Sequence, residues 1–323
     1  MSFEQDISKN INFGENYEFG DFAANSKTTR EQLCCLSSIY PALQITSYGR
    51  SVMGKPLWLA KIGTGSRRLL FSASHHGNEW VSTWVLMRFI TQLCQAAIGN
   101  DTIYNVCAHE LLKHTTIFLA PLVNPDGVDL AAGIINSGKY YEKAKKIASY
   151  YPELPFPEGW KSNIKGIDLN LQYPASWRRA KAIKEELGYK HPAPQNYVGK
   201  RPLCAPESLA LADLTYKLSP ALILALHSQG EVIYWKYGDL EPYGSAELCE
   251  LLSQVSGYAM EETPAESGNA GYKDWFIKEF DRPGYTVELG MGQNPLPVEQ
   301  FEKIYSDVLP LLVCAAIGGS EIA

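Results

Sequence analysis

The sequence has no stretch that could enter or cross a membrane. No apolar run reaches the length of a membrane-spanning helix, and the longest runs, near 119–123 and 221–226, have the length of β-strands. The amino terminus is polar and acidic and lacks a basic segment followed by an apolar one, so it does not indicate a signal peptide. We therefore expect a cytoplasmic protein without a membrane partner.

Dense basic clusters and a disulfide framework are also missing. Lys and Arg number 29 against 35 Asp and Glu, a formal net charge of -6, which disfavours nucleic acid as a partner. Hydrophobic residues make up 46% and charged residues 20%, values that exclude disorder and fibrous proteins. The seven cysteines lack the spacing of disulfides or of a thiolate zinc site, so free thiols are the simpler interpretation.

What the sequence does contain is an alternation of short apolar strands and helical segments. Because several strands are apolar throughout, we predict an α/β fold: a single-domain mixed β-sheet flanked by helices on both faces. Residues 1–27 are expected to form a loose arm, and residues 28–323 one domain. The expected strands are 43–48, 57–62, 69–73, 116–123, 221–226 and 285–287, and the expected helices are 28–40, 78–99 and 301–317.

Two further stretches, 133–165 and 174–203, show little periodicity and are expected to be long loops that carry short helices. The segment 124–127, Asn-Pro-Asp-Gly, has the composition of a turn. Long loops in a compact domain are more often functional than idle, so we expect these two to shape a site.

Polar side chains stand just past the ends of three predicted strands, where open α/β sheets place their sites. His76 and Glu79 follow the first of these strands, His227 follows the second, and Glu288 follows the third. Each also has an ordinary explanation: a surface histidine beside a helix-start glutamate, a core histidine, or a buried salt bridge. Together they fit a single need. Two histidines and a glutamate leave one zinc position open, and a separate carboxylate can move the proton of the attacking water.

Short segments in the same order along the chain extend this pattern. They are Tyr48-Gly49-Arg50-Ser51, Gly54-Lys55-Pro56, Glu79-Trp80, Asn124-Pro125-Asp126-Gly127, Gly166-Ile167-Asp168-Leu169-Asn170, His227-Ser228 and Asp274-Trp275. On these segments the chain resembles the zinc carboxypeptidase family, the group of pancreatic carboxypeptidase A, from about Thr28 to Ile317. The resemblance implies a zinc carboxypeptidase-like catalytic domain over 28–323.

The resemblance also implies roles for individual residues. His76, Glu79 and His227 would bind one Zn²⁺ ion, and Glu288 would be the general base and acid. Asp168 would accept a hydrogen bond from His76 and fix its tautomer. The arginine with which the family stabilises the oxyanion has its nearest counterpart in Lys161. Solvated-loop or local-turn roles remain open for Lys161 and Asp168.

The sequence departs from the exopeptidases of the family beside Asn170. There, an arginine follows this asparagine and the pair grips the terminal carboxylate of the substrate, whereas Leu171 stands here. The family's mobile active-site tyrosine has no counterpart in register. By resemblance, Lys273 lies in the pocket for the residue beyond the cleaved bond, and with Lys161 and Arg178 it could receive acidic groups.

These departures resemble a bacterial branch of the family, the γ-D-glutamyl-L-diamino acid endopeptidases, as do segments 160–170 and 199–203. The expected substrate is therefore a cell-wall peptide cut between γ-D-glutamate and meso-diaminopimelate. The chain has no room for wall-binding repeats, which favours soluble muropeptides with acidic groups. Two other functions stay open: a metallocarboxypeptidase in which Lys273 or Arg178 replaces the missing arginine, and an inactive binding protein on the same fold.

Overall fold

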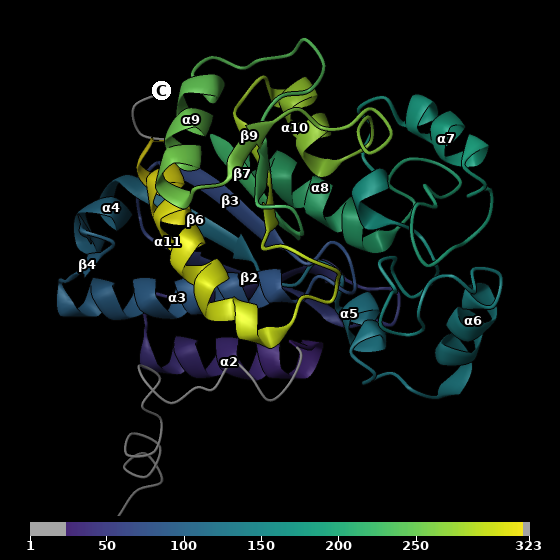
Figure 1. The fold of residues 1–323 in the computed structure, drawn as a ribbon. Helices are drawn as coiled ribbons and strands as arrows, with labels where there is room; N and C mark the ends of the chain where they lie inside the picture. The colour runs from purple at the N-terminus through teal and green to yellow at the C-terminus, as the bar shows by residue number, and fades with distance from the viewer. Residues whose placement is uncertain (1–23, 319–323) are drawn as a thin grey trace, which may run out of the picture.

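The computed structural model describes residues 24–318, in which eight strands form one mixed sheet (Figure 1). Their order is β1-β2-β6-β3-β7-β10-β8-β9. The four central strands, β6, β3, β7 and β10, run parallel, whereas β2 and β8 pair antiparallel to them from either side. The strands are β1 Gln44–Arg50, β2 Pro56–Ile62, β3 Arg67–Ala73, β6 Thr115–Ala120, β7 Leu222–Ser228, β8 Val232–Tyr234, β9 Ala259–Glu261 and β10 Gly284–Leu289.

Side chains of the central strands alternate between two hydrophobic cores, as the pleat of a sheet requires. In β7, Leu224 and Leu226 belong to the larger core, whereas Ile223 and Ala225 belong to the smaller one on the other face. Both faces are therefore buried, and this is why the sequence of the strand is apolar throughout.

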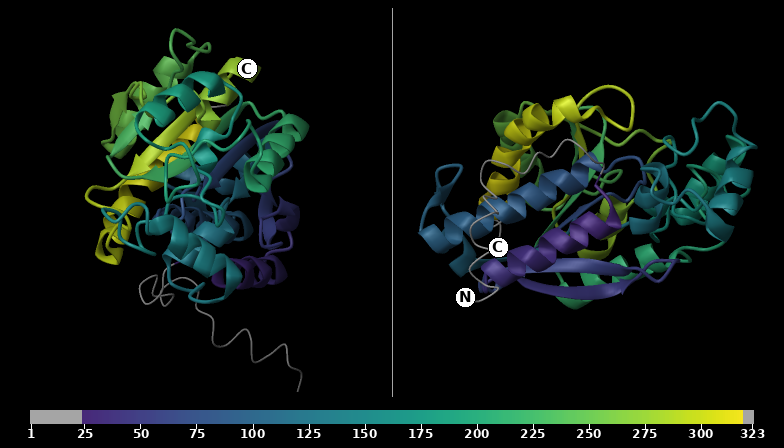
Figure 2. Two further views of the ribbon diagram at one scale, coloured as in Figure 1. Left: turned by 90° about the vertical axis from the view of Figure 1, so that its right-hand side faces the viewer. Right: turned by 90° about the horizontal axis from the view of Figure 1, so that it is seen from below.

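Helices cover both faces of the sheet, which confirms the predicted α/β class. The larger core is closed by α2 (Ser26–Ile39), α3 (Val81–Gly99), α4 (Ala108–His114), α9 (Ser245–Ser256) and α11 (Phe301–Gly318). The smaller core is closed by α8 (Pro206–Leu218) and α10 (Tyr272–Phe280). Figure 2 shows α2 lying alongside α3. Within residues 24–318, no helix is both long enough and apolar enough to cross a membrane.

The first described helix begins slightly earlier than the sequence predicts. Asn25 caps α2, because its Oδ1 accepts the backbone N–H groups of Lys27 and Thr28, both at 3.0 Å. The helix therefore starts at Ser26, and the boundary placed after residue 27 falls inside its first turn. The rest of the predicted arm, residues 1–23, lies outside the described residues.

The turn predicted at 124–127 is instead the start of a helix, α5 (Pro125–Ala131). Asn124 caps this helix, and Pro125 stands in its first turn, where the missing N–H of proline costs no hydrogen bond. The composition of a turn and that of a proline-started helix overlap, so the motif alone predicted the wrong element.

The two long stretches between β6 and β7 carry α6 (Gly138–Ala148) and α7 (Trp177–Glu186), as expected. With α5 they gather at one end of the molecule, on the right in Figure 1, opposite α4 and the small hairpin of β4 (Thr102–Ile103) and β5 (Val106–Cys107). The N–H of Gly77 donates to the carbonyl of Lys161 at 2.8 Å, so this segment lies over the carboxyl end of β3. A Cβ at Gly77 would stand 2.6 Å from the carbonyl oxygens of Gly127 and Trp160, and only glycine fits there.

Ser74 turns the chain sharply out of β3 toward α3. Its φ of 51° lies in the left-handed region, and hydrogen bonds hold it there. The N–H of Ser74 donates to Ser82 Oγ at 3.0 Å, and its own Oγ lies 2.7 Å from Thr83 Oγ1. The turn places residues 75–79 at the carboxyl edge of the sheet.

Asn124 joins three segments at this edge. Its Oδ1 accepts the N–H of Gly127 at 3.0 Å, and its Nδ2 donates to the carbonyls of His75 at 3.0 Å and Ser162 at 3.1 Å. The side chain is fully buried, so no solvent can replace these bonds.

We expect Asn124→Ala to lower the free energy of unfolding by about 3 kcal/mol, because it removes a helix cap and leaves buried carbonyls without donors. Urea unfolding of the purified chain measures this. Asn136→Ala, at an exposed loop asparagine, is the matched control and should change stability by less than about 0.5 kcal/mol. Equal effects at both positions would contradict the role assigned to Asn124.

Candidate functional site

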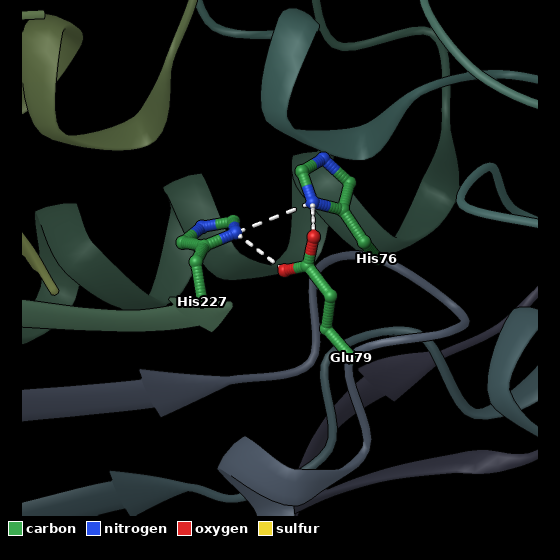
Figure 3. Close-up of side chains that lie close together, drawn as sticks. All are labelled: His76, Glu79 and His227. Atoms are coloured by element: carbon green, nitrogen blue, oxygen red, sulfur yellow. Dashed lines mark hydrogen bonds and ion pairs between the residues drawn. The ribbon is translucent and has the colours of Figure 1, made fainter. Parts of the chain in front are cut away.

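Three side chains from two strand ends converge at the carboxyl edge of the sheet (Figure 3). His227 continues the alternation of β7 toward the smaller core, and His76 and Glu79 come from the turn after β3. Glu79 Oε1 lies 2.9 Å from His76 Nδ1, and Glu79 Oε2 lies 3.0 Å from His227 Nδ1. The Nδ1 atoms of the two rings are 3.3 Å apart. One ligand atom from each of the three residues can be chosen so that all three atoms lie within 4.8 Å of one another.

This spacing fits a tetrahedral zinc ion. Ligand atoms about 2.0–2.1 Å from such an ion are about 3.3–3.4 Å from each other, which matches the separation of the two Nδ1 atoms. Imidazole nitrogen and carboxylate oxygen are also donors that zinc prefers.

The charges around the three residues call for a cation at the same place. Glu79 is 1% exposed, and its charge must be matched within the protein. Although burial acts to lower it, the pKa of His76 is raised to about 10 by the carboxylates of Glu79 and Asp168. In this arrangement a proton on His76 supplies positive charge that a zinc ion bound to neutral rings would supply instead.

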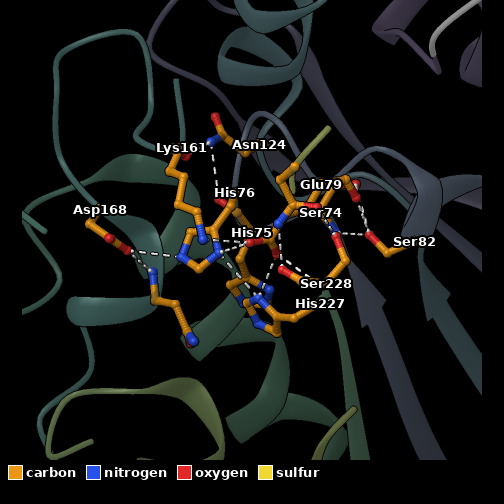
Figure 4. A network of polar contacts seen from close by, with 12 residues as sticks. Ser74, His75, His76, Glu79, Ser82, Asn124, Lys161, Asp168, His227 and Ser228 are labelled. Atoms are coloured by element: carbon orange, nitrogen blue, oxygen red, sulfur yellow. Dashed lines mark hydrogen bonds and ion pairs between the residues drawn. The ribbon is translucent and has the colours of Figure 1, made fainter. Parts of the chain in front are cut away.

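Asp168 holds His76 from the side away from Glu79 (Figure 4). Its Oδ1 lies 3.2 Å from His76 Nε2, and its Oδ2 accepts the N–H of Asn196 at 3.0 Å. Burial acts to raise the pKa of Asp168, but the His76 ring and these hydrogen bonds lower it to about 2. The ionised carboxylate therefore fixes which ring nitrogen of His76 faces Glu79.

Glu288 stands next to His227 across the sheet. The two residues are paired in the parallel register of β10 and β7, so their side chains leave the same face. Burial raises the pKa of Glu288, while the neighbouring His227 and Lys161 act to lower it. The Glu288 carboxylate therefore lies beside the three converging side chains, where it could accept a proton from a water molecule bound at the same point.

Lys161 approaches the same point from the long segment before α7. Its Nζ lies 3.0 Å from Glu79 Oε1, and its side chain remains 29% exposed. Burial lowers the pKa of Lys161, but Glu79 and Glu288 raise it further than burial lowers it, so the ammonium stays charged.

A pocket of about 250 Å³ opens at this site, and His76, Glu79, Lys161, Asp168 and Glu288 line it. Asn170, a predicted substrate-binding residue, also lines the pocket. Ser228 of the His227-Ser228 segment also lines it, and so do polar residues that the sequence analysis did not single out: Lys184, Gln195, Asn196, Gln229, Tyr234, Ser267 and Asn294. Most of them lie on loops without a motif, so the sequence offered no signal for them.

Two predicted substrate-binding residues do not line the pocket. Lys273 is 3% exposed; its ammonium lies 2.7 Å from Asp274 Oδ1 and donates to the carbonyl of Lys236. Arg178 is exposed on α7 and lines a different hollow, with Arg201. The structure therefore gives neither residue a free charge at the site.

Histidine and tyrosine neighbours complete the surroundings of His227. His75 stacks on the His227 ring with centroids 5.3 Å apart, and burial holds the pKa of His75 well below its usual range, so it packs as a neutral ring. Tyr272 is fully buried and its hydroxyl lies 2.7 Å from Thr215 Oγ1, whereas Tyr234 lines the pocket beside Glu288. Of these two tyrosines, only Tyr234 can face a substrate.

The fold and the site together define a class: an α/β protein whose His-Glu-His cluster can hold a metal ion at the carboxyl edge of its sheet. Residues 31–310 match the family model of zinc carboxypeptidases, and the chain belongs to that family. It is a zinc-dependent metallopeptidase.

Two bacterial relatives align with most of the chain. Gamma-D-glutamyl-L-diamino acid endopeptidase 1 of Lysinibacillus sphaericus is 41% identical over 307 residues, which cover 94% of this chain and 73% of the relative. The uncharacterized protein YqgT of Bacillus subtilis is 38% identical over 271 residues, 83% of this chain and 70% of the relative.

Solved structures share the fold at low sequence identity. Carboxypeptidase A of Helicoverpa armigera superimposes with a TM-score of 0.70 at 16% identity, covering 93% of this chain and 74% of that one. Bovine thrombin-activatable fibrinolysis inhibitor gives 0.69 at 17% identity, covering 93% and 98%.

We expect the chain to bind one zinc ion and expect His76→Ala and His227→Ala to lose it. Asp168→Asn should weaken zinc binding about 10- to 100-fold, because the ring of His76 loses its charged partner. Metal analysis and competition with a chromophoric chelator measure both effects. His114→Ala, at an exposed histidine of α4, is the control; undiminished zinc affinity in His76→Ala would refute the ligand set.

Proposed function

We propose that this chain hydrolyses the amide bond between γ-D-glutamate and meso-diaminopimelate in murein peptides, with soluble muropeptides as its substrates. The observation that carries the proposal is the 41% identity, over 94% of the chain, to a relative named for the γ-D-glutamyl-L-diamino acid bond. We assign catalysis to residues 28–323, as the sequence predicts. The cytoplasmic location stays a prediction.

The residue after Asn170 favours this activity over the trimming of ordinary carboxyl termini. Leu171 stands where the exopeptidases resembled by the sequence carry an arginine, and it packs in an apolar cluster with Trp177 and Ala180. Lys273 and Arg178, which could have replaced the arginine, supply no charge to the pocket. The metallocarboxypeptidase alternative therefore lacks the arginine beside Asn170 with which the exopeptidases grip a terminal carboxylate. The binding-protein alternative is disfavoured because the candidate ligands and Glu288 meet at one point.

In the proposed mechanism, Glu288 moves the proton. Its carboxylate takes a proton from the attacking water and returns it to the nitrogen of the leaving amine as the C–N bond breaks. Zinc bound by His76, Glu79 and His227 would polarise the scissile carbonyl and lower the pKa of water. The Lys161 ammonium donates to the oxygen that gains negative charge at the former carbonyl.

We expect the zinc-loaded chain to convert L-Ala-γ-D-Glu-meso-diaminopimelate into L-Ala-D-Glu and free diaminopimelate. Glu288→Gln should slow this reaction by about 10²- to 10⁴-fold without changing zinc content, because the amide cannot accept the proton. Mass spectrometry of the products measures the rate. An intact tripeptide after long incubation, together with rapid cleavage of an all-L peptide at its free carboxyl terminus, would favour the carboxypeptidase instead.

Lys161 has a separate test. Lys161→Met should lower kcat by about 10²- to 10³-fold with a smaller change in KM, because the ammonium stabilises charge that develops in the transition state. Lys161→Arg should restore much of the rate, and Lys165→Met, at an exposed neighbour, should leave it unchanged. A kcat that survives Lys161→Met would show that this lysine only packs beside Glu79.

A further inference from the structure

Two lysines line the pocket, and they differ in what their charges meet. Lys161 is paired with Glu79. Lys184 also lines the pocket, but no hydrogen bond or ion pair joins its ammonium to any residue within 24–318. It has no role in the mechanism above. A charged group held at a site without a partner needs an explanation.

Helix α7 places Lys184 on its buried face. Trp177, Ala180 and Lys184 are the buried residues of this helix, and their spacing of three and four puts them on one side. Trp177 and Ala180 pack with Leu171 in an apolar cluster that fixes the helix beside the loop of the site. Lys184 continues this face as far as the pocket, and it is only 6% exposed.

Burial without a bonded counter-charge marks this ammonium as unusual. Burial lowers the pKa of Lys184, and the more distant Asp168 and Glu266 only partly oppose the effect. The contrast with Lys273 is direct, since that lysine is also buried but is bonded to Asp274. Of the buried lysines in the described part of the chain, Lys184 is therefore the one with an ammonium available to an anion in the pocket.

Asn170 offers a second donor in the same pocket. Its Oδ1 accepts the N–H of Tyr272 at 3.0 Å, which fixes the orientation of the amide. No acceptor within residues 24–318 bonds to the Nδ2 of Asn170, so its two N–H groups are left to donate, and the residue lines the pocket. By the family resemblance, Asn170 marks the side on which the leaving residue lies.

The overall charge of the pocket also suits an anion. Glu79, Asp168 and Glu288 supply three negative charges against two from the lysines. A zinc ion adds two positive charges, so the loaded pocket is net positive. An acidic substrate group placed near Lys184 would meet an unpaired cation in a confined volume, where charge pairing is stronger than in water.

We propose that Lys184, together with Asn170, binds a carboxylate of the residue on the amine side of the scissile bond and so selects an acidic leaving group. This inference rests on the proposed function. It assigns to α7 the charge that the sequence analysis placed on Lys273.

The test compares Lys184→Met with the native zinc-loaded chain on a set of tripeptides. The parent is L-Ala-γ-D-Glu-meso-diaminopimelate. One analogue has L-lysine as its third residue, and others carry an amide at one diaminopimelate carboxyl or at the α-carboxyl of D-glutamate. On the parent, Lys184→Met should lower kcat/KM about 10- to 100-fold, mainly through KM, because a charge-assisted hydrogen bond is lost.

The decisive result is the dependence on the substrate. On an analogue that lacks the bound carboxylate, the native chain should already be slow and Lys184→Met should add little further loss. With the amide on D-glutamate, the full effect of Lys184→Met should remain. Lys184→Arg should keep much of the parent activity, and Lys181→Met, on the same helix and paired with Glu185, should be unchanged.

Each other outcome overturns the inference. Equal loss on every analogue would make Lys184 a structural residue, and loss of its effect only with amidated D-glutamate would place it on the acyl side. If Lys184→Met does not fold, Lys184→Gln replaces it, and the native chain is compared on the parent and on the amidated diaminopimelate peptides. Equal rates of the native chain on these peptides would refute the contact. If the native chain cleaves none of the peptides, the proposed function itself fails, and this inference fails with it.

Discussion

A buried carboxylate, Glu79, is the group on which the rest of the site depends. Its removal from water costs several kcal/mol unless opposite charge and hydrogen bonds replace the solvent. The two rings of His76 and His227 and the ammonium of Lys161 all lie within about 3 Å of it. A zinc ion at the same point matches this charge while the rings stay neutral, and Asp168 then keeps the His76 ring in one orientation. A metal bound there and the fold would therefore stabilise one another.

The alternation of side chains along the strands positions His227 and Glu288 at this site. Along β7, Leu224 and Leu226 pack in the larger core, so His227, the next residue, projects toward the side of the smaller core. The parallel register of β10 sets Glu288 beside it with no further adjustment. Only the contribution from β3 needs a special device, the left-handed turn at Ser74, because His76 and Glu79 come from beyond the strand. Asn124 then ties that turn to the segment that carries Lys161.

The sequence predicts strands and metal-site candidates well because both follow from strong local signals. Strands buried on both faces are apolar runs, and the polar residues that end them mark the edge of the sheet. A short motif on a helix does not predict in which direction the neighbouring side chains point. Lys273 adjoins the Asp274-Trp275 motif, yet all three residues are buried in α10 and its ammonium turns to Asp274. The local sequence could not show that the same ammonium also donates to the carbonyl of Lys236, which lies far away along the chain.

The signal that could have identified Lys184 in the sequence is the periodicity of a helix and not a short motif. Lys184 shares the face of Trp177 and Ala180, and a lysine in line with apolar residues is unusual unless its head reaches a polar space. In the exopeptidases resembled by this sequence, the positive charge comes from the residue directly after the asparagine that Asn170 matches. Here Leu171 stands at that position and packs against Trp177 and Ala180 of α7, and in our proposal Lys184 of the same helix supplies the cation. The same edge of the sheet can therefore receive an acidic group from a different direction, and the residue that selects it moves from the position after Asn170 to the long segment 174–203.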